Sequence, residues 1–451
     1  MNKKTAHILW FKDVNKNDIP LVGGKGANLG EMVKAGIPVP DGFVVTAKAY
    51  FDFINATSLK KKIMTELSGL DVDDSDKLMK ASENIKTAIL QAEMPRELIE
   101  EVKEFYMELC GENDKYVAVR SSATAEDLPE ASFAGQQESF LNIKGWKSVA
   151  QHVQKCWASL FTARAIFYRQ ENKFSHLKVG IAVPVQLMCQ SDMSGIMFTV
   201  NPVTNNRDEI SVEGAYGLGQ PVVSGEITPD QYTVDKKSWK ILSKNIVSQD
   251  WQLTMDGNTP ISTKYKKKQK LTDKQIVDLA KIGAMIEEHY GKPQDIEYGI
   301  EKGRILIVQS RPVTTLEQKV HNVVVDEGKG SKVILDGLAA SPGVFAGEVQ
   351  IIKSPKEISK VKEGDILVAE MTNPDYVPAM KRAGAIVTDL GGRTSHAAIV
   401  SRELGVPAVV GTLNATKMLS NGEVVTVDGS SGKIYEDDIT KTVSEVKKSE
   451  V

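Results

Sequence analysis

The stretch Gly391-Gly392-Arg393-Thr394-Ser395-His396-Ala397-Ala398-Ile399 decides how the C-terminal part of this chain folds. The apolar residues 385–388 before it predict a buried strand, and residues 397–404 predict a helix that ends at Gly405. His396 is therefore expected in the first turn of a helix, among free backbone N–H groups and the positive end of the helix dipole. This field disfavours an imidazolium and favours a phosphoryl group, so the site suits a neutral, nucleophilic imidazole that carries phosphate. The alternative is a glycine turn with a capping histidine.

The composition of the chain is that of a globular protein with two or three domains. It has 451 residues, of which 41% are hydrophobic and 25% charged. The net charge of -3 argues against a general nucleic-acid or membrane-surface binder, because the chain has no built-in attraction to phosphate backbones. We therefore expect no nucleic-acid partner and no membrane partner.

The cysteines and the N-terminus point to a cytoplasmic protein. Cys110, Cys156 and Cys189 are far apart and odd in number, so they are expected to be reduced, mostly buried thiols outside any metal cluster. No apolar segment follows the first residues, and no apolar run reaches transmembrane length.

The distribution of apolar and polar segments divides the chain into two domains of α+β type. Residues 1–314 mix helices and strands, and residues 315–332 are mostly polar and predict a linker. Residues 333–438 predict a second domain, and residues 439–451 a charged tail that is either frayed helix or disorder. The strands expected in the second domain are 344–352, 365–369, 385–388, 408–410 and 423–427.

A glycine-rich segment near the N-terminus, Val22-Gly23-Gly24-Lys25-Gly26, matches neither a P-loop nor a dinucleotide fingerprint. What remains is a flexible glycine loop that presents Lys25 before a helix. Such a lysine can act as a point charge on a phosphate. A turn with a solvated lysine is the alternative.

Two arginines are further candidates for phosphate contacts. Arg120 ends the expected strand 117–120 and is followed by the hydroxyl-rich Ser121-Ser122-Ala123-Thr124. A guanidinium beside such a loop fits a polyphosphate, because Arg120 offers a bidentate fork; a capped loop with a surface arginine is the alternative. Arg164 lies on an amphipathic helix, where spacing alone favours a solvated or snorkelling arginine.

A predicted hairpin places a carboxylate near an amide. A three-residue turn at Lys302-Gly303-Arg304 would put Glu297 opposite Gln309, with Arg311 two residues along on the same face. A two-residue turn would shift the register by one residue and separate them. A carboxylate with an amide oxygen suits Mg²⁺, which prefers oxygen ligands and bridges phosphates. A surface salt bridge between Glu297 and Arg311 is the alternative.

These segments together resemble the phosphoenolpyruvate synthase and pyruvate phosphate dikinase family. The resemblance covers nearly the whole chain, and its motifs occur in the family's order. They are Gly24-Lys25-Gly26, Pro38-Val39-Pro40-Asp41-Gly42-Phe43, Val119-Arg120-Ser121-Ser122, Ser194-Gly195-Ile196-Met197-Phe198-Thr199, Gly217-Leu218-Gly219, Thr228-Pro229-Asp230, Gln309-Ser310-Arg311-Pro312 and the stretch 391–399.

The resemblance implies an ATP-grasp nucleotide-binding domain followed by a smaller, swivelling β/β/α phosphohistidine domain. It also implies a role for each candidate residue. Lys25, Arg120 and Arg311, with Arg164 as a further phosphate-facing arginine, would bind ATP; Glu297 and Gln309 would hold Mg²⁺; and His396 would be the phosphorylated residue, with Arg120 and Arg311 assisting catalysis.

Within this family the chain resembles the synthases more than the dikinases. Arg393 is similar to the synthase form and Ser395 to the dikinase form, and the longer insertions of the dikinases are absent. Gln220 replaces a glutamate that is usual after Gly217-Leu218-Gly219, which puts any role of that position in doubt.

The expected reaction is ATP-dependent phosphorylation of His396 with release of AMP and phosphate, for transfer to pyruvate. Family synthases bind pyruvate on a barrel that does not follow residue 451 here, so we expect a partial enzyme whose barrel is missing or lies on a partner subunit. The alternatives are a stand-alone phosphohistidine carrier or regulatory nucleotide-binding subunit, and a pyruvate dikinase that uses inorganic phosphate.

Overall fold

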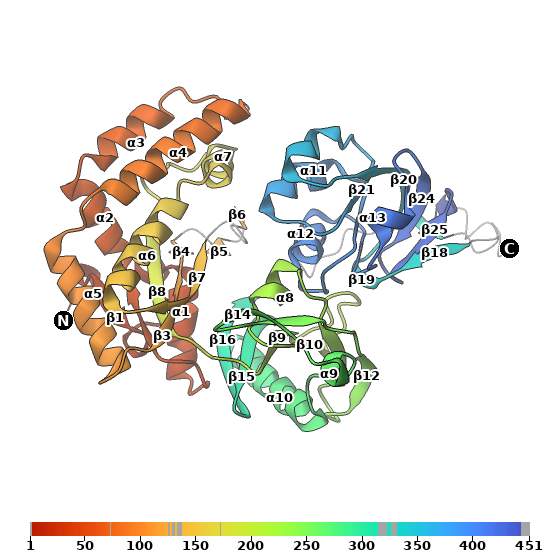
Figure 1. The fold of residues 1–451 in the computed structure, drawn as a ribbon, viewed down its shortest axis with the longest axis horizontal. Coiled ribbons are helices and arrows are strands. Elements are labelled where there is room, and N and C mark those ends of the chain that lie inside the picture. The colour runs from red at the N-terminus through yellow and green to blue at the C-terminus, as the bar shows by residue number, and fades with distance from the viewer. Residues whose placement is uncertain are drawn as a thin grey trace. The chain divides into compact units, whose positions relative to one another are not determined.

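A computed structural model describes residues 2–72, 74–124, 127–128, 131–132, 138–171, 173–313, 323–325 and 332–442. The chain divides into two compact units (Figure 1). Unit 1 comprises Met1–Cys189 with Leu306–Arg311, and unit 2 comprises Gln190–Ile305 with Pro312–Val451. The domain boundaries predicted at residues 314, 332 and 438 do not coincide with the limits of these two units, and they stay predictions.

Unit 1 is built on a twisted sheet that is covered by helices. Its strand order is β1-β2-β8-β3-β7, with β4 paired to β8. The strands are β1 (Ile8–Trp10), β2 (Gly42–Val45), β3 (Tyr116–Arg120), β4 (Ser122–Ala123), β7 (Ser139–Lys144) and β8 (Ile181–Leu187), and β5 (Asp127–Leu128) pairs separately with β6 (Ala131–Ser132). The helices are α1 (Ile19–Lys34), α2 (Ala47–Ala56), α3 (Leu59–Leu67), α4 (Ser75–Gln91), α5 (Arg96–Cys110), α6 (Trp146–Ser159) and α7 (Ala163–Glu171).

The core of unit 1 explains why its helices form where they do. Apolar residues of α2, α4, α5 and α6 pack with those of β3 and β8 in one cluster that contains Phe53, Tyr106 and Trp157. Each of these helices has a single apolar face, so burial against the sheet stabilises it more than helix propensity does.

Unit 2 contains two sheets. The first sheet has the order β12-β11-β10-β9-β15 and is packed on α10. Its elements are β9 (Met193–Phe198), β10 (Glu209–Tyr216), β11 (Asp230–Asp235), β12 (Ile241–Asn245), β15 (Gln294–Glu301) and α10 (Asp273–Tyr290). Around it lie α8 (Gln220–Ser224), α9 (Thr263–Lys266) and the hairpin of β13 (Trp251–Thr254) and β14 (Gly257–Pro260).

The second sheet of unit 2 carries the stretch that contains His396. Its order is β18-β25-β24-β20-β21-β22-β23-β19, and β20, β21, β22 and β23 run parallel. The elements are β18 (Val333–Asp336), β19 (Leu338–Ser341), β20 (Val344–Ile351), β21 (Ile366–Ala369), α11 (Val377–Arg382), β22 (Ala385–Thr388), α12 (His396–Leu404), β23 (Ala408–Val410), α13 (Ala415–Met418), β24 (Val424–Asp428) and β25 (Lys433–Glu436).

The apolar strand before His396 is buried on both faces, as parallel strands usually are. Ile386 packs into a cluster with α11 and α12, whereas Ala385 and Val387 pack into a cluster on the opposite face that includes Ala415 of α13. The five strands expected in this part of the chain are all present, within one residue at each end. The strands β18, β19 and β25 were not predicted.

Part of the predicted tail is ordered as a strand. Residues Thr440–Thr442 form β26, which pairs antiparallel with β17 (Val323–Val325) from the predicted linker. The prediction of helix or disorder is therefore wrong for residues 440–442. These two short strands form by pairing with each other over a long distance in sequence. The sequence of either segment alone does not predict that pairing. Residues 443–451 and most of the predicted linker lie outside the described residues.

The loop between β15 and β16 (Arg304–Pro312) corrects the predicted hairpin. It has two residues, Lys302 and Gly303, and both have positive φ (49° and 78°). This is the backbone of a type I′ turn, which matches the twist of the flanking strands. The three-residue turn is therefore wrong, and with it the register that placed Glu297 directly opposite Gln309.

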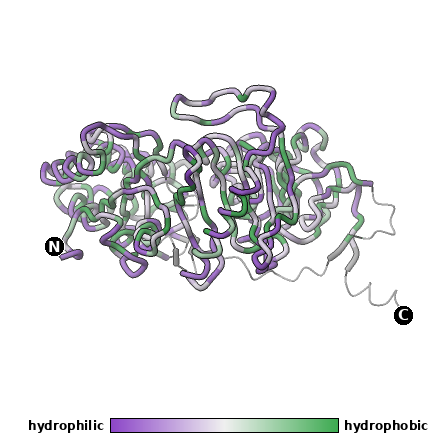
Figure 2. The backbone as a smooth tube through the Cα atoms, turned by 90° about the horizontal axis from the view of Figure 1, so that it is seen from below, coloured by the Kyte–Doolittle hydropathy of each residue, from purple (hydrophilic) through white to green (hydrophobic). Residues whose placement is uncertain are grey.

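Apolar segments are short throughout the described residues. Hydrophobic and hydrophilic residues interleave along the tube in Figure 2, and none of the described helices is long and apolar enough to cross a membrane. Cys110, Cys156 and Cys189, all among the described residues, are buried thiols that form no disulfide, as expected.

Candidate functional site

His396 is the first residue of helix α12, and the loop before it holds it at the helix N-terminus. Ser395 is the N-cap residue with extended backbone, and Gly405 ends the helix in the left-handed conformation, as predicted. Thr372 Oγ1 lies 2.9 Å from His396 Nδ1. Because this hydrogen bond engages Nδ1, it orients the ring so that Nε2 is the nitrogen available for chemistry.

The two glycines before His396 are required by close packing within unit 2. Gly391 has φ 108°, which is a conformation that favours glycine. A Cβ atom on Gly392 would lie 2.8 Å from Pro229 Cδ and 3.0 Å from Glu213 Oε2. The residues 391–395, named here the carrier loop, therefore lie directly against the first sheet of unit 2.

Glu213 of β10 is the main polar contact of the carrier loop. Its side chain, only 1% exposed, accepts hydrogen bonds from the Arg393 N–H at 2.8 Å, from Gln231 Nε2 at 3.0 Å and from the Thr394 hydroxyl. Burial raises the pKa of Glu213, while the hydrogen bonds from Thr394, Gln231 and Arg393 oppose that rise. The sequence interpretation missed Glu213, because the alternating residues 209–213 indicate a strand but give no sign of this contact.

Two arginines, one in the carrier loop and one on α12, lie beside this contact. The Arg393 side chain donates to the carbonyl of Ala339 at 3.1 Å, which holds the carrier loop to its own domain. Arg402 of α12 donates to Ala340 O and lies over the Phe198 ring at 5.6 Å. Burial lowers the pKa of Arg402 to about 10, against the attraction of Asp295 and Glu213.

Lys25 of unit 1 lies within a kinked helix. Helix α1 is broken at Gly23 (φ 66°), and Lys25 stands in the first turn of the part that follows the break. The prediction of a loop before the helix is therefore wrong for Lys25. The Lys25 N–H donates to Ser122 Oγ at 3.1 Å, and its Nζ donates to the Ser121 carbonyl at 3.0 Å. A Cβ atom on Gly23 would lie 2.2 Å from Ser122 Oγ, so only glycine allows this approach.

Arg120 and the strand that carries Gln309 and Arg311 also belong to unit 1. Arg120 is the last residue of β3, as predicted, and is 9% exposed. Its Nη1 donates to the carbonyl of Val308 at 3.4 Å. Gln309 is 7% exposed, and its Oε1 is buried without a hydrogen-bond partner among the described residues. The structure thus places Arg120 beside the 308–311 segment, and Lys25 bonds to Ser121, the residue that follows Arg120.

The remaining predicted residues stand on other elements. Arg164 stands on α7 in unit 1 and is partly buried. Glu297 lies on β15 in unit 2, so it and Gln309 belong to different units. Groups of three or more His, Cys, Asp or Glu that could hold a metal are absent from the part of the chain that the structure describes.

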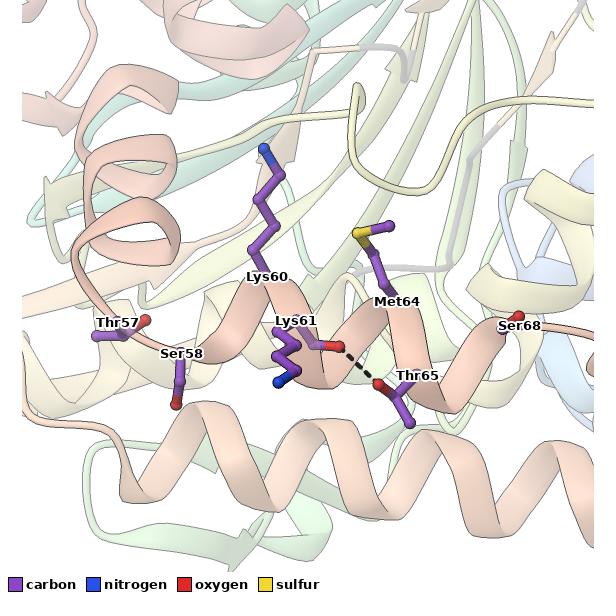
Figure 3. A pocket seen from close by; sticks show the side chains of 7 residues that line it. All are labelled: Thr57, Ser58, Lys60, Lys61, Met64, Thr65 and Ser68. Carbon is purple, nitrogen blue, oxygen red and sulfur yellow. Dashed lines mark hydrogen bonds between the residues drawn. The ribbon is translucent and has the colours of Figure 1, made fainter.

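A surface pocket on unit 1 is unrelated to these residues. It lies along α3, encloses about 650 Å³ and is shown in Figure 3. Lys60 and Lys61 extend in opposite directions from the helix, and Thr65 donates to the Lys61 carbonyl. Its lining residues are Thr57, Ser58, Lys60, Lys61, Met64, Thr65 and Ser68. None of the candidate residues takes part.

Comparison with known proteins identifies the family. Residues 19–330 match the family described as "Pyruvate phosphate dikinase, AMP/ATP-binding domain". The chain belongs to this family. Residues 361–432, which include the carrier loop and His396, match "PEP-utilising enzyme, mobile domain". The resemblance inferred from the motifs is confirmed, and so is a mixed helix-and-sheet fold with an ATP-binding domain and a domain of the mobile type.

Several curated relatives are phosphoenolpyruvate synthases by name. That of Pyrococcus furiosus is 51% identical over 476 residues, which cover 95% of this chain and 58% of the relative. The probable phosphoenolpyruvate synthase of Archaeoglobus fulgidus is 54% identical over 442 residues, covering 96% and 59%. That of Aquifex aeolicus is 43% identical over 487 residues, covering 99% and 56%. The chain thus spans less than two thirds of the length of these relatives.

Proposed function

We propose that this chain performs the ATP-dependent half of a phosphoenolpyruvate synthase reaction, in which His396 is phosphorylated and AMP and phosphate are released. The observation that carries the proposal is the placement of His396 at the N-terminus of α12 with Nδ1 held by Thr372. Helix N-termini stabilise phosphoryl groups through their free N–H groups. The family match supplies the ATP-binding domain that such a histidine needs as donor.

The proposed chemistry uses Nε2 of His396 as the nucleophile. In the reactive tautomer Nδ1 carries the ring proton and donates a hydrogen bond to Thr372 Oγ1, so the lone pair lies on Nε2. Nε2 attacks the β-phosphorus of ATP, the bond to the α-phosphate oxygen breaks, and AMP leaves. Water then cleaves the outer phosphate from the pyrophosphorylated histidine, which yields phospho-His396 and inorganic phosphate.

Three cationic side chains are proposed to bind the triphosphate. Lys25, Arg120 and Arg311 carry charges that would neutralise the phosphate oxygens, and Arg164 is a fourth candidate. Arg120 lies beside the segment that ends in Arg311, which supports a shared role for these two residues. Fixed cations that match the charge developing on transferred phosphate account for most of such catalysis.

Mg²⁺ is proposed as the cofactor, and the donor set fits it. Gln309 Oε1 is a buried oxygen that has no hydrogen-bond partner among the described residues, which is how an oxygen ligand awaiting a hard cation would be placed. Gln309 and Glu297 would hold the ion. When bound, Mg²⁺ would reduce the repulsion between the phosphate oxygens and the nucleophile.

The later steps require movement of the domain that carries His396. We propose that residues 333–438 swivel on the 315–332 linker, in the manner named by the mobile-domain family, to reach an acceptor. The relatives' names point to pyruvate as this acceptor, and we expect it to bind on a barrel outside this chain. The barrel would come from a partner subunit or from the rest of a longer chain.

The labelling of His396 tests the proposal. Incubation with ATP labelled with ³²P at the β-position should give an acid-labile, base-stable label and stoichiometric AMP. The label should be lost in His396→Ala and kept in His289→Ala, which removes an exposed histidine of α10. A label that persists in His396→Ala would overturn the assignment.

The second product distinguishes the synthase from its alternatives. A synthase forms AMP in buffer without phosphate, whereas a dikinase requires added inorganic phosphate for ATP cleavage. A regulatory subunit binds ATP but forms no AMP. A stand-alone carrier becomes labelled but gives no phosphoenolpyruvate when pyruvate and the C-terminal part of a relative are supplied together.

A further inference from the structure

The carrier loop is held to the first sheet of unit 2 by a single buried carboxylate. Glu213 Oε1 accepts from the Arg393 N–H at 2.8 Å, and Oε2 accepts from the Thr394 hydroxyl. Both donors lie within three residues of His396. Hydrogen bonds to a charged acceptor are about twice as strong as neutral ones, so this pair dominates the polar contacts of the loop.

The same contact buries two hydroxyl groups that form no hydrogen bond with the described residues. Ser395 Oγ and Thr228 Oγ1 are buried and have no hydrogen-bond partner among the described residues. Ser395 lies against Gly225, where an added Cβ would be 3.2 Å from Ser395 Cβ, and Thr228 Cγ2 lies near Gly411. Both residues therefore lie at the contact, where their hydroxyls are buried, and Ser395 Oγ lies beside Gly391 of its own loop.

Unsatisfied buried hydroxyls oppose docking, because water would bind them as soon as the two surfaces separate. A buried polar group without a partner costs on the order of 1–3 kcal/mol. Two such groups are comparable in magnitude to the hydrogen bonds that Glu213 makes with the loop. The hydrogen bonds of Glu213 thus favour docking, whereas the burial of the Ser395 and Thr228 hydroxyls opposes it.

We propose that Glu213 is a positioning residue that latches the carrier loop onto the first sheet of unit 2, and that the hydroxyls of Ser395 and Thr228 keep this latch weak enough to release. The role of this latch rests on the proposed function, because a domain that carries phosphate must dock at the ATP-binding domain and then leave it. The docking contact itself does not depend on ATP or on phosphorylation.

The position of the carrier loop can be measured without nucleotide. Cys110, Cys156 and Cys189 are buried, so spin labels can be attached selectively at the exposed positions of Lys240→Cys and Lys417→Cys. The first reports on the first sheet and the second on the carrier domain. The full chain should give one narrow distance distribution.

Loss of the latch should broaden that distribution. Glu213→Ala should lower the docked-to-undocked ratio by about tenfold or more, and Glu213→Gln and Thr394→Val should lower it less. The effects of Glu213→Gln and Thr394→Val should be non-additive, because they remove the same bond. Glu209→Gln is the matched control on β10, since Glu209 accepts from Asn201 and Asn206 and not from the carrier loop.

Removal of the unsatisfied hydroxyls should act in the opposite direction. In the Glu213→Gln background, either Ser395→Ala or Thr228→Val should restore the docked ratio by about fivefold. A merely structural defect in β10 would not be rescued by Ser395→Ala, which lies on the opposite side of the contact from Glu213. Thr228→Val keeps the side-chain volume, so the gain cannot come from repacking.

Two results would overturn the latch. One is a Glu213→Ala chain that keeps the narrow distribution, with circular dichroism showing an intact fold. The other is a looser contact in Ser395→Ala or Thr228→Val. If the wild-type chain docks as expected but His396 is never labelled by ATP, the proposed function fails while the latch stands.

Discussion

Thr372 Oγ1 lies 2.9 Å from Nδ1 of His396 and joins the loop after β21 to the first residue of α12. Thr372 is buried, so its hydroxyl has little access to competing water. This hydrogen bond orients the ring, and when Nδ1 is its donor, Nε2 carries the lone pair.

Thr372→Val should therefore slow the ATP-dependent labelling of His396 by about tenfold, since it removes one hydrogen bond at nearly constant volume. The measurement is a time course of labelling at saturating ATP. The control is Thr412→Val, which removes the hydrogen bond from the Thr412 hydroxyl to the Thr388 carbonyl in the same domain. Equal labelling rates in the two variants would contradict the role of Thr372.

Gly23→Ala should weaken ATP binding. Gly23 has φ 66°, and an added Cβ would overlap Ser122 Oγ, the atom that accepts from the Lys25 N–H. Relief of this overlap would displace Lys25, so the Kd for ATP is expected to rise by about tenfold or more. Calorimetric titration measures it.

Gly36→Ala provides the comparison for that substitution. Gly36 also has positive φ (74°), but nothing lies within 4 Å of its added Cβ. It should cost about 1 kcal/mol of stability through backbone strain and leave ATP affinity unchanged. Equal losses of ATP affinity in both variants would show that strain alone, and not the displacement of Lys25, is responsible.

The His7 cluster should make stability pH-dependent. Burial favours the neutral ring, but the hydrogen bonds that the ring donates to Asp52 and Glu101 outweigh it, so the pKa of His7 is raised above 6.5. A raised pKa contributes stability that is fully present below about pH 6.5 and is lost as the pH rises through the folded value. The Tm difference between wild type and His7→Gln should be larger at pH 5.5 than at pH 8.5; a difference independent of pH would exclude this contribution.

Arg169→Met should be neutral or stabilising by up to about 4 kcal/mol, because a buried guanidinium is replaced by an apolar chain of similar length. Arg169 is fully buried, its Nε donates to His176 Nδ1 at 3.0 Å, and its Nη1 and Nη2 have no partner among the described residues. Urea unfolding measures the change. Burial, with Arg169 nearby, lowers the pKa of His176 to about 4, so the pKa should rise toward 6.5 in the variant. A strongly destabilised Arg169→Met would indicate an anion bound to the guanidinium.

Local patterns were enough to predict the strands and the helix around His396. The run 385–388 is apolar at every position because both faces of β22 are buried, and Gly405 ends α12 because only a left-handed residue closes the helix there. The N-terminal position of His396 followed from the same signals. These features depend on residues close in sequence, so they can be read from it.

The sequence by itself determined the order of the motifs, the helix that begins at His396, and the candidate residues Lys25, Arg120, Arg164, Glu297, Gln309 and Arg311. Only the tertiary structure decided which distant segments contact one another. Glu213 was not among these candidates, yet the carrier loop, 178 to 182 positions later, bonds to it and helps to bury it. The β15–β16 turn had two residues where three were predicted, and Val323–Val325 found its partner in Thr440–Thr442. Each depends on contacts between distant segments, whose free energy comes from burial and pairing that no local pattern encodes.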